Sequence, residues 1–283
     1  MLTVYAPAKV NLVLEVLGEC ADYHELSSVV QAIGLYDVLN FELADELSFE
    51  CSEASLESHN LVVEAATLLR EATGHRDGAR IELRKHIPWG MGLGGGSSDA
   101  ASTLKALSKL WKLELPTLDL LSLAFRLGSD VPFFIYGGTG LIEGRGERVT
   151  PLAPLTPTCF VLLLPSVAVM PGKTKQLYGK LKAGDYTEGQ FVRAALLSLR
   201  RSGTVLPSLM WNAFERVAYD LFPELDELRS TLEKAGASSV CLAGSGPCLF
   251  TPVTEEGRAR EICLRLEGQG LQCYLTRSVA AQQ

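Results

Sequence analysis

Hydrophobic and polar positions alternate along several stretches in the N-terminal part of the chain, as they do in strands buried on one face. The alternation predicts strands at three places: residues 11–17, 38–43 and 79–84. Before the last of these, apolar residues from Leu61 to Leu69 recur at helical spacing. Asn60 is suited to cap the start of this helix, and Gly74 to end it. This part of the chain is therefore predicted to mix strands and helices.

The C-terminal part begins after three prolines, at 151, 154 and 157, which cannot all lie inside regular elements. They predict a boundary between a domain at 1–152 and an α+β domain at 153–283. Beyond them the periodicity predicts, in order, a strand at 159–164, helices at 187–201, 208–219 and 224–235, strands at 239–243 and 247–252, a helix at 255–267 and a strand at 271–276. The closing order of elements favours a small sheet with helices on one face.

The composition is that of an ordinary globular protein. The 283 residues are 47% hydrophobic and carry a formal charge of −7. No run of Lys and Arg marks a nucleic-acid-binding face, and the longest apolar stretch, 160–170, is interrupted by Pro165 and too short to cross a bilayer. Neither nucleic acid nor a membrane is an expected partner.

Two further features concern the cell compartment. The first residues show no basic and apolar signal segment, so a cytoplasmic location is expected. Seven widely spread cysteines without a C-x-x-C pair fit reduced thiols better than disulfides or a zinc site.

A glycine-rich segment is the strongest candidate for chemistry. Five of the seven residues in Gly90-Met91-Gly92-Leu93-Gly94-Gly95-Gly96 are glycine, and a predicted helix with apolar positions from Ala100 to Trp111 follows. Glycine lets the main chain approach a ligand closely, and the free N–H groups of a helix start attract an anion. The segment therefore predicts a polyphosphate site, with a flexible turn as the alternative.

Better-known glycine loops fit this segment less well. A Walker A loop requires Lys where the chain has Gly96 after Gly95. The spacing of Gly90, Gly92 and Gly95 matches a dinucleotide fingerprint, but no second strand ending in an acid follows about 20 residues on. Both alternatives are set aside.

Three other stretches combine polar groups with special backbone residues. The first strand carries Lys9 and Asn11, and Asp130 lies beside Gly, Ser, Pro and Phe. Residues 243–247, Ala-Gly-Ser-Gly-Pro, form a predicted tight turn between two strands. Taken singly, each has a structural interpretation: a surface charge for Lys9, a turn or helix cap for Asp130, and a connecting turn for 243–247.

Taken in order, residues 7–12, 88–101 and 243–247 resemble the three motifs of the galactokinase, homoserine kinase, mevalonate kinase and phosphomevalonate kinase superfamily. The middle motif is the most specific, and the three span almost the whole chain. Within the superfamily, Tyr23-His24-Glu25-Leu26, residues 128–133 and the spacing from Thr174 to Tyr178 look most like the members that phosphorylate diphosphocytidyl-methylerythritol in the non-mevalonate route to isoprenoid precursors.

The resemblance implies a two-domain α+β kinase fold with the active site in the cleft between the domains. It implies transfer of the γ-phosphoryl group of ATP to a hydroxyl of a small-molecule cytidyl diphosphate substrate, with Lys9 and Asp130 as the catalytic pair. Phosphoryl transfer generally also uses Mg²⁺, for which the sequence indicates no protein ligand. The chain is expected to act as a monomer or homodimer.

Further positions follow from the resemblance alone. Those matching the ATP site are Asn60, Lys85, Pro88, Gly90, Gly92, Leu93, Gly94, Gly95, Gly96, Ser97 and Ser98. Those matching the substrate site are Asn11, Tyr23, His24, Thr174 and Tyr178. Because neighbours on a regular strand point to opposite faces, Tyr23 and His24 are predicted to lie on a loop if both contact the cytosine base.

The chain departs from the subgroup at two places. Ala21-Asp22 replaces the usual Asp-Gly before Tyr-His, and the usual Ser before Thr174 is missing from residues 169–173. Two alternatives follow: another small-molecule kinase of the superfamily, or a non-catalytic ligand-binding regulator with the same fold. A pure binder would not need both Lys9 and Asp130, which argues against the regulator.

Overall fold

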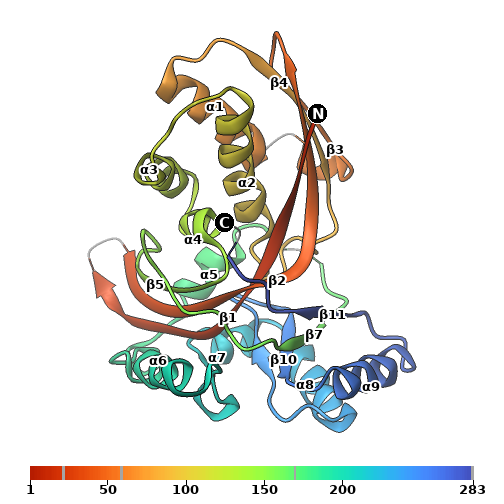
Figure 1. The fold of residues 1–283 in the computed structure, drawn as a ribbon. Coiled ribbons are helices and arrows are strands. Elements are labelled where there is room, and N and C mark those ends of the chain that lie inside the picture. Colours follow the sequence, from red (N-terminus) through yellow and green to blue (C-terminus); the bar gives the residue numbers. More distant parts are fainter. Residues whose placement is uncertain (21–22, 58–59, 169, 282–283) are drawn as a thin grey trace. The chain divides into compact units, whose positions relative to one another are not determined.

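The computed structural model describes residues 1–20, 23–57, 60–168 and 170–281, and the chain forms two compact units (Figure 1). Unit 1 consists of residues 1–8, 35–88 and 94–136, and unit 2 of residues 9–34, 89–93 and 137–283. This division differs from the boundary predicted at 152. Two long strands, β1 (Leu2–Cys20) and β2 (Tyr23–Ala44), and the glycine-rich segment each contribute residues to both units.

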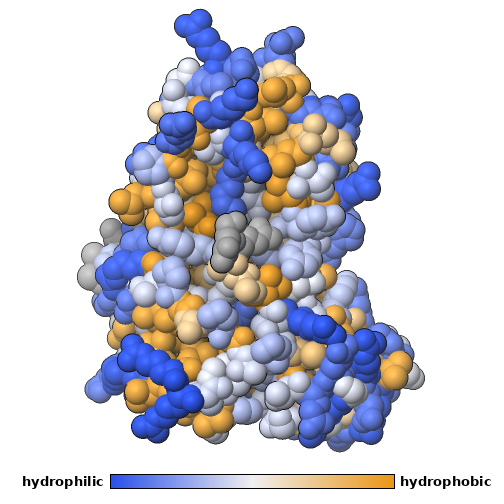
Figure 2. Space-filling view, viewed as in Figure 1, coloured by the Kyte–Doolittle hydropathy of each residue, from blue (hydrophilic) through white to orange (hydrophobic). Residues whose placement is uncertain are grey.

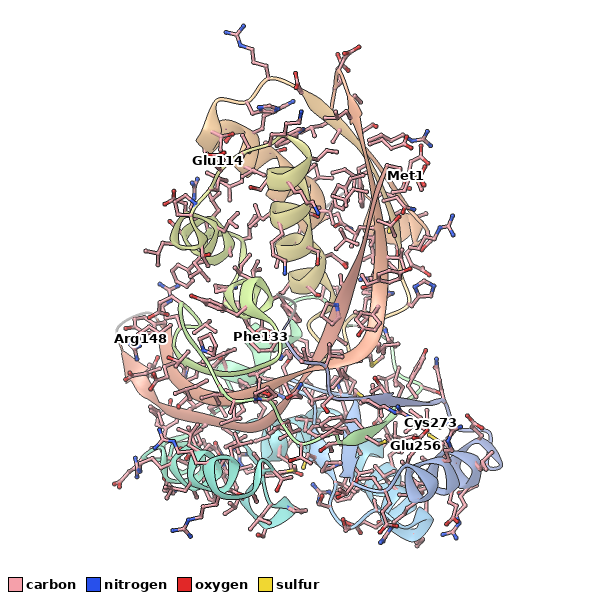
Figure 3. The ribbon with its side chains drawn as sticks, viewed as in Figure 1. Met1, Glu114, Phe133, Arg148, Glu256 and Cys273 are labelled. Atoms are coloured by element: carbon pink, nitrogen blue, oxygen red, sulfur yellow. The ribbon has the colours of Figure 1, made fainter. Side chains whose placement is uncertain are left out.

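Unit 1 packs four helices with strands of a seven-stranded sheet. In the sheet, β4 (Gly78–Arg84) pairs antiparallel with the end of β2 and parallel with β3 (Ser48–Cys51). The helical elements are η1 (Ala54–Leu56), α1 (Leu61–Thr73), α2 (Gly95–Leu110), α3 (Thr117–Leu127) and α4 (Val131–Tyr136). Small residues and an apolar stripe bury most of α2, which contacts α1 and α4, and α4 contributes the buried Phe133 (Figure 3).

Unit 2 contains a four-stranded antiparallel sheet with the strand order β11, β7, β10, β9. Its strands are β7 (Cys159–Leu163), β9 (Cys241–Leu242), β10 (Leu249–Val253) and β11 (Cys273–Arg277). Every residue of β7 is buried, and α9 (Glu256–Glu267) covers the face that carries Val161 and Leu163 with a stripe that includes Ile262 and Leu266. Apart from the exposed Leu264, the other side of α9 is mostly polar, as the blue residues at lower right in Figure 2 show.

Other strands of unit 2 pair with the two long strands β1 and β2. Here β5 (Thr139–Gly144) pairs with the start of β2 and with β6 (Arg148–Pro151), while β8 (Trp211–Asn212) pairs parallel with β1. The remaining elements are α5 (Lys173–Tyr178), η2 (Ala183–Asp185), α6 (Gln190–Ser202), η3 (Pro207–Leu209), α7 (Glu215–Leu221) and α8 (Glu224–Ala235).

Most predicted elements are confirmed, including the Asn60 cap and the left-handed Gly74 that ends α1. The helix predicted at 208–219 is wrong. That stretch divides into η3, β8 and the start of α7, and Asn212 bonds neighbouring main chain instead of continuing a helix. Over the described residues, six cysteines are free and no helix is long and apolar enough to cross a membrane.

Candidate active site

Lys9 lies on β1 in unit 2 with a side chain that is almost fully buried. Its Nζ donates to Asn11 Oδ1 at 2.8 Å. Asn11 Nδ2 in turn donates to Ser28 Oγ at 2.8 Å, and that hydroxyl donates to the Val13 carbonyl at 2.6 Å. A hydrogen-bonded series therefore orients the ammonium group, and the surface-charge interpretation of Lys9 is wrong.

The first part of the glycine segment meets the 243–247 turn within unit 2. A Cβ on Gly92, whose φ is +83°, would lie 1.9 Å from the Ala243 carbonyl oxygen. A Cβ on Gly244 would lie 2.8 Å from the Gly92 oxygen and 3.1 Å from Lys9 Nζ. The Lys9 N–H also donates to the Leu93 carbonyl at 2.9 Å. Glycine is required here because main chain packs directly on main chain, beside the ammonium group.

Asn212 supports this turn and was missed by sequence reasoning. Its Nδ2 donates to the carbonyls of Leu242, at 2.9 Å, and Gly244, at 2.8 Å. Its Oδ1 accepts from the Phe214 N–H. Nothing in the local sequence distinguishes Asn212 from a polar residue of the helix predicted there.

The second part of the glycine segment begins α2 in unit 1. Gly94 is its N-cap with φ +73° and provides no side chain to bond the first N–H groups. A helix start with open N–H groups and the positive end of the dipole attracts anions. Ser98 Oγ and Asp99 Oδ1, which follow this first turn in α2, are buried and have no hydrogen-bond partner among the described residues.

Lys85, predicted near the nucleotide, lies in a buried ion cluster of unit 1. Its Nζ contacts Asp37 Oδ2 at 2.5 Å and Asp99 Oδ2 at 2.8 Å. Asp37 Oδ1 also accepts from the N–H groups of His86 and Ile87. Burial, with a smaller contribution from Asp37, raises the pKa of Asp99 to about 7 although Lys85 opposes the shift. The ammonium is thus used to neutralise protein carboxylates.

Asn60 and Asp130 also lie in unit 1. The Asn60 amide caps α1, since Oδ1 accepts from Val62 N–H at 2.9 Å and Nδ2 donates to the Leu56 carbonyl. Asp130 is half-buried and directly precedes α4. That position agrees with the turn or helix cap predicted for Asp130.

An aromatic cluster in unit 2 includes two of the predicted substrate residues. The His24 ring lies 4.8 Å from that of Tyr178, which meets Phe214 edge-on at 4.8 Å, and Tyr186 lies 6.0 Å from His24. Tyr23 instead places its ring 5.0 Å from the Arg145 guanidinium carbon. The two side chains have different partners because β2 begins at Tyr23, so the loop predicted for Tyr23 and His24 is wrong.

Thr174, the remaining predicted substrate residue, lies on the first turn of α5. Its hydroxyl is 3.0 Å from that of Ser245 in the 243–247 turn. The departure at residues 21–22 lies outside the described residues.

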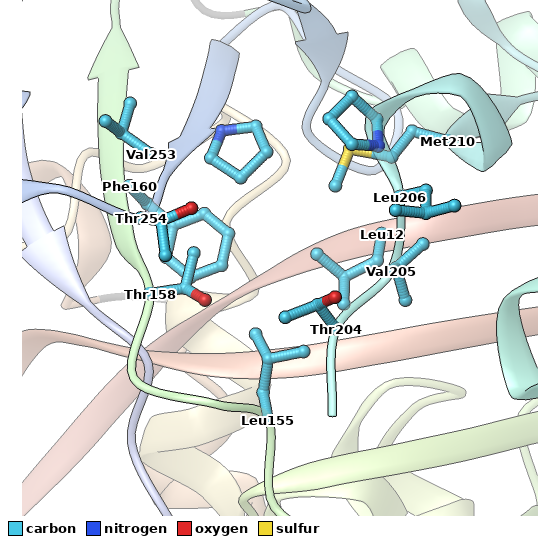
Figure 4. Close-up of a pocket in the computed structure, with 12 residues that line it drawn as sticks. Leu12, Leu155, Thr158, Phe160, Thr204, Val205, Leu206, Met210, Val253 and Thr254 are labelled. Atoms are coloured by element: carbon cyan, nitrogen blue, oxygen red, sulfur yellow. The ribbon is translucent and has the colours of Figure 1, made fainter. Parts of the chain in front are cut away.

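A separate pocket of unit 2 has a different character (Figure 4). Its lining contains no ionisable side chain and consists of Leu12, Leu155, Thr158, Phe160, Thr204, Val205, Leu206, Pro207, Met210, Pro252, Val253 and Thr254. It offers no charge to a polyphosphate, which distinguishes it from the glycine-lined region around Lys9.

Comparison with known proteins shows which family shares this sequence and this fold. Family descriptions of the GHMP kinases match the chain twice, the N-terminal domain over residues 60–138 and the C-terminal domain over residues 193–270. The homoserine kinase from Cytophaga hutchinsonii shares the fold, with a TM-score of 0.75 at 20% identity over 99% of this chain and 95% of that one. The chain is thus an ATP-dependent small-molecule kinase with the two-domain α+β fold of this superfamily.

More similar proteins narrow the assignment. A protein of Dehalococcoides mccartyi named 4-diphosphocytidyl-2-C-methyl-D-erythritol kinase is 43% identical over 277 residues, 97% of each chain. A crystal structure of a 4-(cytidine 5'-diphospho)-2C-methyl-D-erythritol kinase has a TM-score of 0.83 at 36% identity and covers 98% of this chain and 99% of its own. The chain belongs to the 4-diphosphocytidyl-2-C-methyl-D-erythritol kinase family, which confirms the subgroup that its motifs resemble.

Proposed function

We propose that this kinase transfers the γ-phosphoryl group of ATP to a hydroxyl of 4-diphosphocytidyl-2-C-methyl-D-erythritol. The observation that carries the proposal is the meeting of Lys9, the glycine segment at Gly92 and the turn at Gly244 in unit 2. Main-chain N–H groups and a buried ammonium together suit a polyphosphate. The family to which the chain belongs supports the choice of acceptor.

The chemical roles follow from what phosphoryl transfer requires, namely an oriented acceptor and neutralised charge. Asp130 accepts or orients the proton of the acceptor hydroxyl. Lys9, oriented by Asn11, stabilises the negative charge on the transferred group.

Mg²⁺ is part of this proposal, and it supplies charge neutralisation on the phosphates when bound. Among the described residues, no group of three His, Cys, Asp or Glu side chains could hold a metal ion. The unpartnered oxygens Ser98 Oγ and Asp99 Oδ1, buried beside the helix start, have the hard-oxygen chemistry that Mg²⁺ prefers. The ion would therefore rely on the nucleotide phosphates, water and one or both of these oxygens.

The base of the substrate is assigned to the aromatic cluster. His24 and Tyr178 provide adjacent rings, and Tyr178 is supported from the side by Phe214. A pyrimidine stacks on such a surface without any charged contact. Tyr23 is not part of this cluster, because its ring contacts Arg145.

An ADP-release assay tests the proposal with ATP and Mg²⁺ and four acceptors: diphosphocytidyl-methylerythritol, mevalonate, homoserine and galactose. The cytidyl acceptor should give the highest kcat/KM. A preference for another acceptor would show a different kinase of the superfamily. Nucleotide binding without turnover on any acceptor would indicate a regulator.

A further inference from the structure

Lys173 is a second buried lysine in unit 2, and its side chain joins two glycine turns. It is the first residue of α5, with 7% of its surface exposed. Its Nζ donates to the Gly90 carbonyl at 2.7 Å and also to the Gly246 carbonyl. One ammonium group therefore links the start of the glycine segment to the 243–247 turn, across 83 and 73 residues of sequence.

The two hydrogen-bond acceptors of Lys173 use two of its three N–H donors and do not neutralise its charge. Both are main-chain carbonyls, and the titratable groups that face it from neighbouring elements are Lys9 of β1 and Cys248 beside β10. Burial and the nearby Lys9 lower the pKa of Lys173 to about 8. Burial also raises the pKa of the Cys248 thiol to about 12, so that thiol provides no negative charge at neutral pH.

A purely structural bridge would not need a charged group here. A buried ammonium costs free energy unless an anion compensates it, and the elements it joins are those that frame the proposed polyphosphate site. Next to Lys173, the Thr174 hydroxyl contacts that of Ser245, so α5 is attached to the same turn twice. The uncompensated charge is explained if the compensating anion is the ligand.

We propose that Lys173 is a positioning residue for nucleotide binding: it fastens Gly90 to Gly246 and leaves its positive charge to be neutralised by the bound polyphosphate. The inference rests on the proposed function, since it takes the phosphates of ATP as the anion. It adds a cation that acts through the two glycine turns and is distinct from Lys9.

The proposal predicts that proton uptake accompanies nucleotide binding at alkaline pH. In the free protein a group with a pKa near 8 is mostly neutral at pH 8.5, and phosphate nearby restores its proton. Binding of ADP with Mg²⁺, measured by titration calorimetry in buffers of different ionisation enthalpy, should take up about 0.7 proton at pH 8.5. At pH 6.5, where Lys173 is already charged, uptake through this group should vanish.

Three variants separate positioning from simple packing. Lys173→Met should bind ADP about ten-fold more weakly at pH 6.5 and lose the uptake at pH 8.5. Lys173→Arg keeps a permanent charge, so it should retain more of the affinity and also show no uptake. Lys175→Met, at an exposed position on the same helix, is the matched control and should behave like the wild type.

The possible outcomes separate the role of Lys173 from the nucleotide site itself. Wild-type affinity and uptake in Lys173→Met would overturn the role of Lys173, as would wild-type binding without uptake at pH 8.5. If Lys173→Met does not fold, persistence of the uptake in Lys173→Arg would equally overturn it. A folded wild-type protein that binds no ADP at any pH would instead overturn the proposed nucleotide site itself.

Discussion

Two buried lysines lie near the two ends of the glycine segment, and one is paired with carboxylates whereas the other is paired with main-chain carbonyls. In unit 1, Lys85 contacts two carboxylates, one of them Asp99 at the start of α2. In unit 2, Lys173 contacts the carbonyls of Gly90 and Gly246. The carboxylates raise the pKa of Lys85 against the effect of burial, whereas the pKa of Lys173 is lowered by burial and by Lys9.

The difference indicates which lysine is structural and which is available to a ligand. The positive charge of Lys85 is already matched by protein carboxylates, so an added phosphate gains little from it. Lys173 has only neutral acceptors, and a phosphate would supply the missing charge. Position in the sequence alone would favour Lys85 as the lysine that contacts the nucleotide, because it precedes Gly90 by only five residues.

Removing Lys85 should produce the largest effect on stability. Lys85→Met leaves Asp37 and Asp99 buried without their cation, and the free energy of unfolding should fall by about 3–5 kcal/mol in chemical denaturation at pH 8. Lys109→Met, at an exposed site on α2, should change it by less than about 0.5 kcal/mol.

The pH dependence checks the same comparison. Because the pKa of Asp99 is raised, its folded form retains a proton more readily than the unfolded chain, so its contribution is most favourable at low pH and is lost as the pH rises through about 7. The loss in free energy of unfolding caused by Lys85→Met should therefore be smaller at pH 5 than at pH 8. A deficit below 1 kcal/mol at pH 8, or one that grows on acidification, would contradict the assignment.

Glycine substitutions test whether the first part of the glycine segment, which Lys173 contacts at Gly90, is the part that binds the nucleotide. Gly92→Ala adds a Cβ 1.9 Å from the Ala243 oxygen at a positive φ, and ADP should bind ten-fold or more weakly. Gly95→Ala should weaken binding less, since its Cβ would meet side-chain atoms of Ile87, Lys85 and Asp37 at 3.1–3.3 Å.

The control for backbone strain is Gly74→Ala, which has φ +65° with open space around the Cβ and lies outside the proposed site. Calorimetry with ADP should show no change in its affinity, although some stability is lost. Equal affinity losses in Gly92→Ala and Gly74→Ala would trace the effect to strain and remove the argument for close main-chain approach.

An effect on the acceptor alone, and not on the nucleotide, is expected at the aromatic cluster. Tyr178→Ala removes the ring that packs on His24 and should lower kcat/KM for the cytidyl acceptor about ten-fold while ADP affinity stays unchanged. Tyr274→Ala on β11 serves as the control. Equal losses for acceptor and nucleotide would show that the cluster supports the unit as a whole.

Local patterns predicted the parts of the fold that depend on neighbouring residues. The start of α1 at Asn60 and the order of β9, β10, α9 and β11 follow from caps and periodicity within a short window. The same holds for the glycine segment, whose density of glycine before a helix indicates an anion site without any tertiary information.

Features that depend on distant residues were not accessible in this way. Asp37 is 48 residues from Lys85, and nothing around either residue indicates that they pair. Asn212 appeared to belong to a helix because its role is to bond carbonyls of the Leu242–Gly244 stretch, 30 and 32 residues away. The role proposed for Lys173 likewise depends on its contacts with Gly90 and Gly246, which are distant in the sequence.

The most direct test of the account is the steady-state kinetics of Asp130→Asn with ATP and diphosphocytidyl-methylerythritol. In this variant kcat should fall by about 10²–10⁴-fold while both KM values stay near those of the wild type, because Asp130 acts on the acceptor proton in the transition state. Asp119→Asn, at an exposed position on α3, should leave both parameters unchanged. A near-wild-type kcat in Asp130→Asn, or a loss confined to KM, would show that Asp130 only caps the turn before α4 and would contradict the proposed mechanism.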